Sequence, residues 1–287
     1  MAQISIAVPV YNGEAMLGDA LECLRIQSFT DFEVVILDNA STDATRAIAQ
    51  SFVDRDARFR LIVQPFNKGA MGNFIDGLAS ATAPTFLFRA HDDIDDAIYL
   101  EELHGALTAN PQAKLATGVV RSMLLDGGKQ RVFTFPRLTG VEFIDVVQLL
   151  FRSHAGWFYG LWDVQAFREV WDEMLRAFPH PWASDHLIMF PFLIDRAVVH
   201  SPRTTFTKYI KRRSDAPRSR ARPPLAEMLQ FRRDFASWCG AVIDRRFAGR
   251  PFMRRALHVA LWFYVNKRVY RFRTVLRVWI AEKLRSK

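Results

Sequence analysis

The chain has 287 residues, of which 50% are hydrophobic and 24% are charged, so it can bury the core of one large domain or of one domain with an appendage. Its two cysteines, Cys23 and Cys239, exclude a disulfide framework and favour a reducing cytosol. The formal net charge of +9 predicts an anionic partner: a nucleotide, a nucleic acid or a membrane surface.

Strand and helix patterns alternate over the first hundred residues. Four apolar runs predict strands at residues 4–10, 32–37 and 59–64 and from residue 85 onward. Between them, apolar residues recur at helical spacing. This alternation with short connections predicts an α/β fold with a mostly parallel sheet.

Three polar loops follow the first, second and fourth of these strands. They are residues 11–14, 38–43 and 91–93. Parallel strands place such loops at the same edge of the sheet, and ligands of α/β sheets bind beyond the carboxyl ends of the strands. The sequence therefore predicts a ligand site where these loops converge.

The third loop belongs to an acidic stretch, Arg89-Ala-His-Asp-Asp-Ile-Asp-Asp96, directly after an apolar strand. Carboxylates this close repel one another, more strongly where the dielectric is low. Solvent, basic partners or a hard divalent cation would offset the repulsion. The alternative is a solvated acidic turn that caps a helix starting near Ala97.

The pattern changes after residue 111. Apolar runs at 115–125 and 131–135 flank Asp126-Gly-Gly and predict a hairpin. A helix is predicted over 141–151, followed by a segment rich in aromatic residues. We expect most of these rings to pack in the core and one or two to line a pocket. Asp185 precedes the apolar run 187–194, as either a helix cap or a functional group at a site wall.

The last part of the chain is basic. Residues 208–222 predict a flexible basic loop, which is either a solvated linker or a lid that closes on a diphosphate. Residues 251–287 predict helices in which basic and aromatic residues alternate, with Glu282 as the only acid. This favours an anionic membrane surface, or a helix packed on the domain with an exposed basic face. No nucleic-acid-binding module is recognised, so nucleic acid is not expected as a partner.

Four motifs together resemble those of family 2 glycosyltransferases of the GT-A fold. They are Val8-Pro-Val-Tyr-Asn-Gly-Glu14, Asp38-Asn-Ala-Ser-Thr-Asp-Ala-Thr45, Asn67-Lys-Gly69 followed by Asn73, and Ala90-His-Asp-Asp-Ile94. The resemblance implies a Rossmann-like, mostly parallel sheet flanked by helices. It also implies a GT-A domain over residues 1–210, with a nucleotide-sugar half (1–110) and an acceptor half (111–210). Residues 211–287 would form a basic loop and an amphipathic helical extension.

The resemblance also implies a role for each motif residue. Asp185 would deprotonate the acceptor hydroxyl, and Asp93 would bind the metal, Mn²⁺ or Mg²⁺, and the diphosphate. The nucleotide sugar, with a UDP-sugar favoured, would contact Pro9, Tyr11, Asn12, Glu14, Asp38, Asn39, Asn73 and Asp92. Within this set the resemblance implies that the Tyr11 ring would lie against the base, that Asp38 and Asn39 would face the base, and that Asp92 would face the ribose or sugar.

Among the departures from the family pattern, two concern residues of the expected site. Asn39 stands where a second Asp is frequent, which leaves the identity of the base open because Asn both donates and accepts. His91 stands before the acidic pair where an acid or a small residue is frequent. His91 is either a loop histidine or a metal ligand.

The sequence thus predicts a metal-dependent inverting glycosyltransferase that moves one sugar from a nucleotide-diphosphate sugar to a hydroxyl acceptor. Synthesis of a surface polysaccharide or a lipid-linked glycan is expected, by a cytoplasmic protein or one held peripherally at the inner face of a membrane. The start of the chain lacks the basic and apolar segments of a signal peptide, which favours this location. The alternative is a non-catalytic nucleotide-sugar-binding or membrane-associated protein of the same fold.

Overall fold

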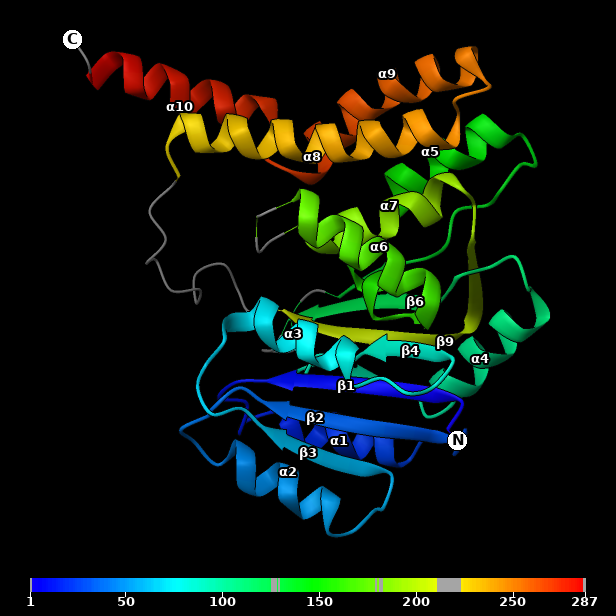
Figure 1. The fold of residues 1–287 in the computed structure, drawn as a ribbon, viewed down its shortest axis with the longest axis vertical. Helices are drawn as coiled ribbons and strands as arrows, with labels where there is room; N and C mark the ends of the chain where they lie inside the picture. The colour runs from blue at the N-terminus through cyan, green and yellow to red at the C-terminus, as the bar shows by residue number, and fades with distance from the viewer. Residues whose placement is uncertain are drawn as a thin grey trace. The chain divides into compact units, whose positions relative to one another are not determined.

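The computed structural model describes residues 2–124, 128, 130–178, 180, 183–210 and 223–285 (Figure 1). The chain divides into two compact units. The first consists of Met1–Phe135, His154–Glu169 and Ala197–Arg213, and the second of Pro136–Ser153, Val170–Arg196 and Ser214–Lys287. The predicted basic loop over 211–222 and the Asp126-Gly127 turn lie outside the described residues.

The first unit contains a sheet of nine strands, counted over the described residues, in the order β3-β2-β1-β4-β8-β6-β9-β5 with β7 paired to β6. Strands β3, β2, β1 and β4 are mutually parallel, and antiparallel pairs begin at β8. The strands are β1 (Ile4–Val10), β2 (Phe32–Asp38), β3 (Phe59–Val63), β4 (Thr85–Phe88), β5 (Ile94–Asp95), β6 (Leu115–Leu124), β7 (Arg131–Phe133), β8 (Leu161–Asp163) and β9 (Val198–Ile210). The predicted α/β class is confirmed.

Helices cover both faces of the parallel part of this sheet, with α1 and α2 on one face and α3 on the other (Figure 1). All seven residues of β1 are buried as a result. Gly77 of α3 lets this helix approach closely, because a Cβ there would lie 3.1 Å from the Cβ of Ala7. The helices of the unit are α1 (Leu17–Arg25), α2 (Thr45–Val53), α3 (Gly69–Ala79), α4 (Tyr99–Ala109), the short 3-10 helix η1 (Ala155–Tyr159) and the start of α6 (Val164–Ala177).

Strand β9 was not predicted from the sequence. Its 13 residues pair in parallel with β6 and, near their end, antiparallel with β5. The β-branched and aromatic content of the segment is typical of a strand, but Pro202 interrupts the pattern. Residues 202–204 of β9 form a bulge there, because Gly118 of β6 pairs with Ser201 and Val119 with Thr205. Lys208, predicted to lie in the basic loop, is instead part of this strand.

The second unit is helical. Its helices are α5 (Glu142–Arg152), the rest of α6, α7 (Ser184–Ile194), α8 (Leu225–Arg246), α9 (Pro251–Arg268) and α10 (Phe272–Arg285). The Tyr264 ring of α9 packs on Phe190 of α7 and Phe235 of α8, at centroid distances of 5.5 and 6.1 Å. Residues 251–268 therefore share a core with 184–194, so the units divide the chain differently from the predicted boundary at residue 210.

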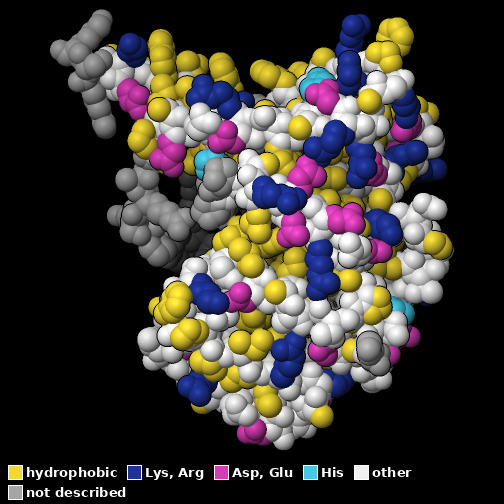
Figure 2. All heavy atoms as spheres, in the orientation of Figure 1, with side chains coloured by type: hydrophobic (Ala, Val, Ile, Leu, Met, Phe, Trp, Pro, Cys, Tyr) yellow, Lys and Arg dark blue, Asp and Glu magenta, His cyan; other side chains and the backbone are white. Residues whose placement is uncertain are grey.

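The C-terminal helices also carry apolar side chains outside this core. Phe252, near the start of α9, is 84% exposed. Figure 2 shows hydrophobic side chains with Lys and Arg among them along the upper edge of the view, over α9 and α10. No helix in the described part of the chain combines the length and the apolar composition needed to cross a membrane.

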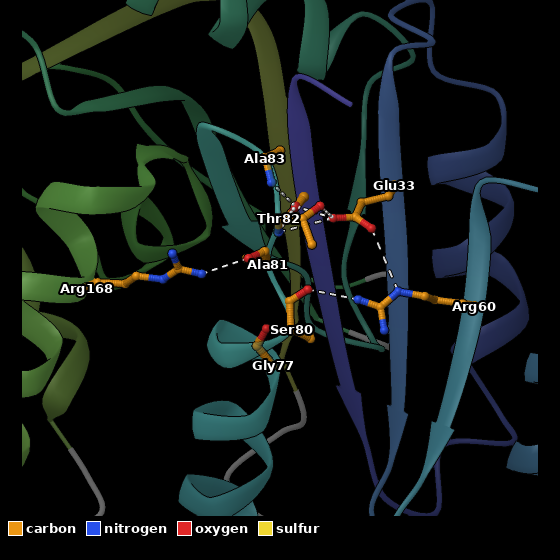
Figure 3. Close-up of polar contacts among 9 residues, drawn as sticks. Glu33, Arg60, Gly77, Ser80, Ala81, Thr82, Ala83 and Arg168 are labelled. Carbon is orange, nitrogen blue, oxygen red and sulfur yellow. Dashed lines mark hydrogen bonds and ion pairs between the residues drawn. The ribbon is translucent and has the colours of Figure 1, made fainter. Parts of the chain in front are cut away.

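The amino-terminal edge of the parallel strands is closed by the protein's own polar groups (Figure 3). The Glu33 carboxylate accepts hydrogen bonds from the hydroxyls of Ser5 and Thr82 and lies 3.8 Å from the Arg60 guanidinium. Arg168 donates to the Ala81 carbonyl oxygen at 2.7 Å. Polar groups at this edge are therefore paired within the fold, unlike several at the carboxyl edge.

Candidate functional site

A cavity of about 390 Å³ lies within the first unit at the carboxyl ends of β1, β2 and β4. The parallel register places Val10 beside Asp38 and Ala7 beside Phe88, so the loops after these strands leave the sheet at one edge. Five of the predicted site residues line the cavity: Pro9, Tyr11, Asn39, Asn73 and Asp92. The other lining residues are Val10, Asn67, Gly69, Ala70, Phe74, Ala90, His91 and Tyr159.

Asn12 and Glu14 do not line this cavity; they connect the first loop to the second. The Asn12 side-chain oxygen accepts a hydrogen bond from the Thr42 backbone N–H at 2.9 Å. Glu14 donates its N–H to Asp43 and accepts the N–H of Ala44. Asn12 adopts a φ of 48°, in the left-handed region that few residues other than glycine and asparagine tolerate. These contacts give both residues a role in holding the loops together.

Asn39 builds one wall of the cavity. Its side-chain N–H groups donate to Asn67 Oδ1 at 2.9 Å and to the Gly69 carbonyl oxygen at 3.2 Å, and its Oδ1 accepts the Lys68 backbone N–H at 2.9 Å. Asn67 and Gly69 line the cavity themselves. Aspartate has no side-chain N–H to donate, so the asparagine at this position has a clear structural reason.

Two further polar residues of the nucleotide set, Asp38 and Asn73, lie deep in the fold. Asp38 is 1% exposed, is not among the lining residues, and accepts the Ser41 backbone N–H at 3.0 Å. Asn73 donates to the Leu37 carbonyl oxygen at 2.9 Å, while its own side-chain oxygen has no hydrogen-bond donor within the described residues. Because Asn73 lines the cavity, that oxygen is a candidate acceptor for a ligand N–H or O–H group.

The acidic stretch is divided between structural and cavity-facing carboxylates. Asp95 is fully buried and forms an ion pair with Arg89, which is also buried. Asp96 accepts the Thr205 backbone N–H at 2.8 Å, which fastens the stretch to β9. Helix α4 begins after Ile98 with no side-chain cap, so the capping alternative is not what the fold uses.

Asp93 lies beside the cavity-lining Asp92 and is 1% exposed. One of its oxygens accepts the Tyr209 backbone N–H at 3.0 Å, and the other, Oδ2, has no hydrogen-bond donor within the described residues. The ammonium group of Lys208 lies close by, with its Nζ 3.9 Å from Oδ2. Burial raises the pKa of Asp93 to about 6, and the charge of Lys208 opposes this rise.

Lys208, expected in a loop that is either a linker or a lid on the diphosphate, reaches the site from strand β9 instead. Its ammonium lies 5.1 Å from the centroid of the Tyr159 ring, and Tyr159 lines the cavity. Lys208 therefore contacts both a cavity wall and the buried Asp93 carboxylate. Tyr159 fulfils the expectation that an aromatic residue of this segment lines a pocket, whereas Trp157, Phe158 and Trp162 are buried in the core.

The residues present fit a divalent cation that is shared with a ligand. Carboxylate oxygens are hard ligands, and Mg²⁺ is usually held by one or two carboxylates together with substrate phosphates and water. Asp92 lines the cavity and the Oδ2 atom of Asp93 lacks a donor. Within the described residues, no group of three or more His, Cys, Asp or Glu side chains is placed so that it could hold a metal ion by itself. The two carboxylates thus suit a cation that a diphosphate also binds.

His91 lines the cavity and packs against the first loop. A Cβ at Gly13 would lie 2.8 Å from the His91 ring and 2.6 Å from a Val10 methyl group, closer than side chains approach. Glycine at position 13 is therefore required for the His91 ring to occupy this place. This packing explains how a histidine fits at position 91. It gives His91 a structural role and does not identify it as a metal ligand.

Asp185 belongs to the second unit, in the first turn of α7. Its carboxylate is half-buried and accepts its neighbour's N–H, from His186, at 2.8 Å. Ala183, at the start of this helix, has a φ of 62°, which costs a residue with a Cβ about 1–2 kcal/mol. Such backbone strain is often found at functional sites, and here it fixes the direction in which α7 begins.

Parts of the chain are similar in sequence to known glycosyltransferases. The sequence profile described as "Glycosyl transferase family 2" matches residues 5–154, just over half of the chain. An uncharacterized glycosyltransferase of Haemophilus influenzae is 36% identical over 94 residues, which is 32% of this chain and 37% of that protein. The GalNAc(5)-diNAcBac-PP-undecaprenol beta-1,3-glucosyltransferase of Campylobacter jejuni is 30% identical over 109 residues, 38% of this chain and 33% of the relative. The chain thus matches about a third of the length of these relatives.

Solved structures share the fold. The S. aureus protein TarS (residues 1–349, in complex with UDP-GlcNAc) superposes with a TM-score of 0.62 at 17% identity, covering 86% of this chain and 73% of that one. The mannosyltransferase PcManGT from Pyrobaculum calidifontis, in complex with GDP-Man and Mn²⁺, gives a TM-score of 0.55 at 15% identity, covering 98% and 75%. These similarities confirm the predicted GT-A fold, and with the matched profile they show that the chain belongs to glycosyl transferase family 2.

Proposed function

We propose that the protein is a metal-dependent, inverting glycosyltransferase that moves one sugar from a nucleotide-diphosphate sugar to a hydroxyl acceptor. The main support is the cavity at the carboxyl-terminal edge of the parallel strands. Next to it lies the Asp93 carboxylate, whose Oδ2 has no hydrogen-bond donor within the described residues. Such a site combines a pocket for a nucleotide with oxygen ligands for a cation. Family membership and the shared fold support the same activity.

The donor would be a UDP-sugar, with its base at the end of the cavity bounded by the first two loops. Tyr11 is 46% exposed on the cavity wall, so its ring can stack on a base. Asn73 offers an acceptor oxygen. Asp38 and Asn39 would act mainly by shaping this end of the cavity, since their side chains are hydrogen-bonded within the loops. Asn12 and Glu14 would hold the same loops in register.

The diphosphate end would lie at the acidic loop. Asp93 and Asp92 would hold Mn²⁺ or Mg²⁺, which when bound neutralises charge on the departing diphosphate. Lys208 supplies a further positive charge from β9, next to the Asp93 carboxylate. Two sources of positive charge at one end of the cavity suit a leaving group that carries negative charge.

We assign the acceptor base to Asp185. A hydroxyl is a poor nucleophile until a carboxylate takes its proton. Attack from the side opposite the leaving diphosphate inverts the anomeric carbon. The acceptor would be a glycan or a lipid-linked glycan of a surface polysaccharide pathway, and the name of the Campylobacter jejuni relative, which includes an undecaprenol-linked glycan, supports this class. The proposed location is the cytoplasm or the inner face of a membrane.

The test is a thermal-unfolding panel with UDP-, GDP- and dTDP-sugars, each with and without Mn²⁺. A ligand at a hundred times its dissociation constant adds about 2.7 kcal/mol of stability. We expect one donor class to stabilise the protein, more strongly when Mn²⁺ is present. Asp93→Asn should remove the increment due to Mn²⁺. Asp163→Asn, which makes the same charge change at a residue paired with Lys114, is the control and should retain it.

The transfer step needs its own assay. Asp185→Asn should abolish product formation while leaving donor stabilisation intact, because the base acts on the acceptor. If no nucleotide sugar stabilises the protein, the metal-dependent transferase is wrong and the alternative of a non-catalytic, membrane-associated protein gains weight. If a donor binds but Asp185→Asn transfers sugar at the normal rate, the assignment of the base is wrong.

A further inference from the structure

We propose that the outer faces of α9 and α10 form a docking surface for an anionic phospholipid bilayer. The α9–α10 surface comprises four exposed apolar residues of α9, Phe252, Val259, Trp262 and Phe263, and five of α10, Phe272, Leu276, Trp279, Ile280 and Leu284. Binding of the α9–α10 surface to a bilayer does not require sugar transfer, so this proposal is independent of the enzymatic activity proposed above.

The first observation is the concentration of exposed apolar side chains. These nine residues are 42% to 84% exposed. They are nine of the 22 large hydrophobic residues that are exposed in the described chain, although α9 and α10 are two helices of 18 and 14 residues. Single exposed apolar residues are ordinary, but a gathering of this kind marks a binding surface.

The second observation is that packing in the second unit already uses the opposite faces. In α9, Leu257, Leu261 and Tyr264 are buried. In α10, Val275 and Val278 pack with Met228 of α8. The exposed residues Phe252, Val259 and Phe263 recur at the spacing of a single helical face, away from those buried positions. Each helix thus has a second apolar face that the core of its own unit does not cover.

The third observation is the charge of the same segment. Residues 251–287 contain ten of the chain's 39 Lys and Arg residues but one of its 30 acidic residues, so the first 250 residues carry 29 of each. The whole net charge of +9 therefore resides in this segment. Arg255, Arg273 and Arg277 are exposed among the apolar side chains. Arginine with tryptophan and phenylalanine at a surface matches the anionic headgroups and the apolar boundary of a bilayer.

A groove beside the surface repeats this combination. It has a volume of about 410 Å³, and its lining includes Arg232 and Arg233 of α8 and His258 and Trp262 of α9. Trp262 belongs to both the groove and the α9–α10 surface. Apolar and basic groups therefore meet continuously from α8 to α9.

A bilayer accounts for both properties of the surface. A second copy of the chain would cover the apolar residues but would bring two strongly basic segments together, which is unfavourable. A nucleic acid would neutralise the arginines but leave aliphatic residues such as Val259, Leu276 and Leu284 in water. A membrane surface buries the apolar side chains and pairs the basic ones with anionic headgroups.

The experiment is co-flotation of the full chain with vesicles of phosphatidylcholine alone or with about a third phosphatidylglycerol, without any sugar donor. We expect binding to the anionic vesicles that weakens with salt. Trp262→Ser, Phe263→Ser and Trp279→Ser combined should lower the partition coefficient at least tenfold, because each buried aromatic ring contributes on the order of a tenfold factor. Arg255→Gln, Arg273→Gln and Arg277→Gln combined should reduce binding and make it less sensitive to salt.

Matched variants in the first unit serve as controls. Val63→Ser, Phe66→Ser and Val132→Ser remove exposed apolar groups, and Arg46→Gln, Arg55→Gln and Arg131→Gln remove exposed charges. Both control triples should float like the unaltered protein, and all variants should unfold at its midpoint temperature. The proposal is overturned if the protein does not float with anionic vesicles, if the controls lose binding equally, or if the aromatic triple alters only the oligomeric state in light scattering.

Discussion

Among single residues, Asn39 offers the sharpest test of how the cavity wall is built. Asn39→Asp keeps the size of the side chain but removes both donors to Asn67 and Gly69 and places a charge against the Asn67 oxygen. A buried acceptor left without its donor costs about 1–3 kcal/mol. We expect a loss of unfolding free energy of that order in chemical denaturation, together with weaker donor binding. Unchanged stability and affinity would show that the turn at 67–69 is held by other contacts.

Lys208 should control how readily a cation reaches Asp93. Its ammonium lies 3.9 Å from the carboxylate oxygen that lacks a hydrogen bond, so it competes with a cation for the same negative charge. Lys208→Met should therefore tighten Mn²⁺ binding in a titration followed by paramagnetic resonance, with no donor present. Lys114→Met, which removes a lysine paired with Asp163, is the control and should leave Mn²⁺ affinity unchanged. Weaker Mn²⁺ binding in Lys208→Met would contradict this role.

At the scale of secondary-structure elements, the Arg89–Asp95 ion pair joins the end of β4 to β5. Both side chains are buried, so removing one partner leaves an uncompensated charge, at a cost of about 3–5 kcal/mol. Arg89→Met should lower the free energy of unfolding by about that amount. The double variant Arg89→Met/Asp95→Asn contains no buried charge at this place and should be more stable than the single variant. Equal stability of the two variants would show that Asp95 is neutral in the folded protein.

Strand β9 should make stability depend on pH through His200. Burial lowers the pKa of His200, whose ring stacks on Phe135 with a centroid distance of 5.2 Å. The unfolded chain, with a pKa near 6.5, then binds the proton more tightly than the folded one. Stability is retained above that pKa and is lost as the pH falls through it. We compare the free energy of unfolding at pH 7 and pH 5 by denaturant titration. When the pH is lowered from 7 to 5, this free energy should decrease less in His200→Gln than in the unaltered protein.

An element can be predicted from the sequence when the residues that determine it are close together in the chain, and it is missed when it depends on distant partners. Strands β1 to β4 are compact apolar runs joined by short helices, so their order and the convergence of their loops follow from the pattern. Strand β9 contains Pro202 and pairs with β6, which lies far away in the sequence. The local sequence therefore indicated a basic loop at Lys208, and did not indicate that a strand places this residue beside Asp93. Likewise, the orientation of Asn12 toward Thr42 rather than toward the cavity depends on a left-handed backbone conformation that the motif does not reveal.

At the scale of the whole molecule, the C-terminal helices α9 and α10 differ in how much they contribute to the core of the second unit. Leu257, Leu261 and Tyr264 of α9 are buried in the second unit, whereas α10 contributes mainly Val275 and Val278. A chain ending at residue 250 should therefore be recovered mostly in the insoluble fraction. A chain ending at residue 270 should stay soluble and resist limited proteolysis better than the shorter one. Equal solubility of the two chains would contradict this division of roles.

The second unit is assembled from three separate segments, 136–153, 170–196 and 214–287, with parts of the first unit between them. This order has a consequence for synthesis on the ribosome, where the amino-terminal part emerges first. Strands β1 to β4 and their helices can pair as soon as they leave the exit tunnel. Helix α7, whose residues 187–194 are all buried in the finished protein, must wait for α8 and α9. During that interval the nascent chain exposes an apolar helix, which makes this stage the one at which a chaperone would act.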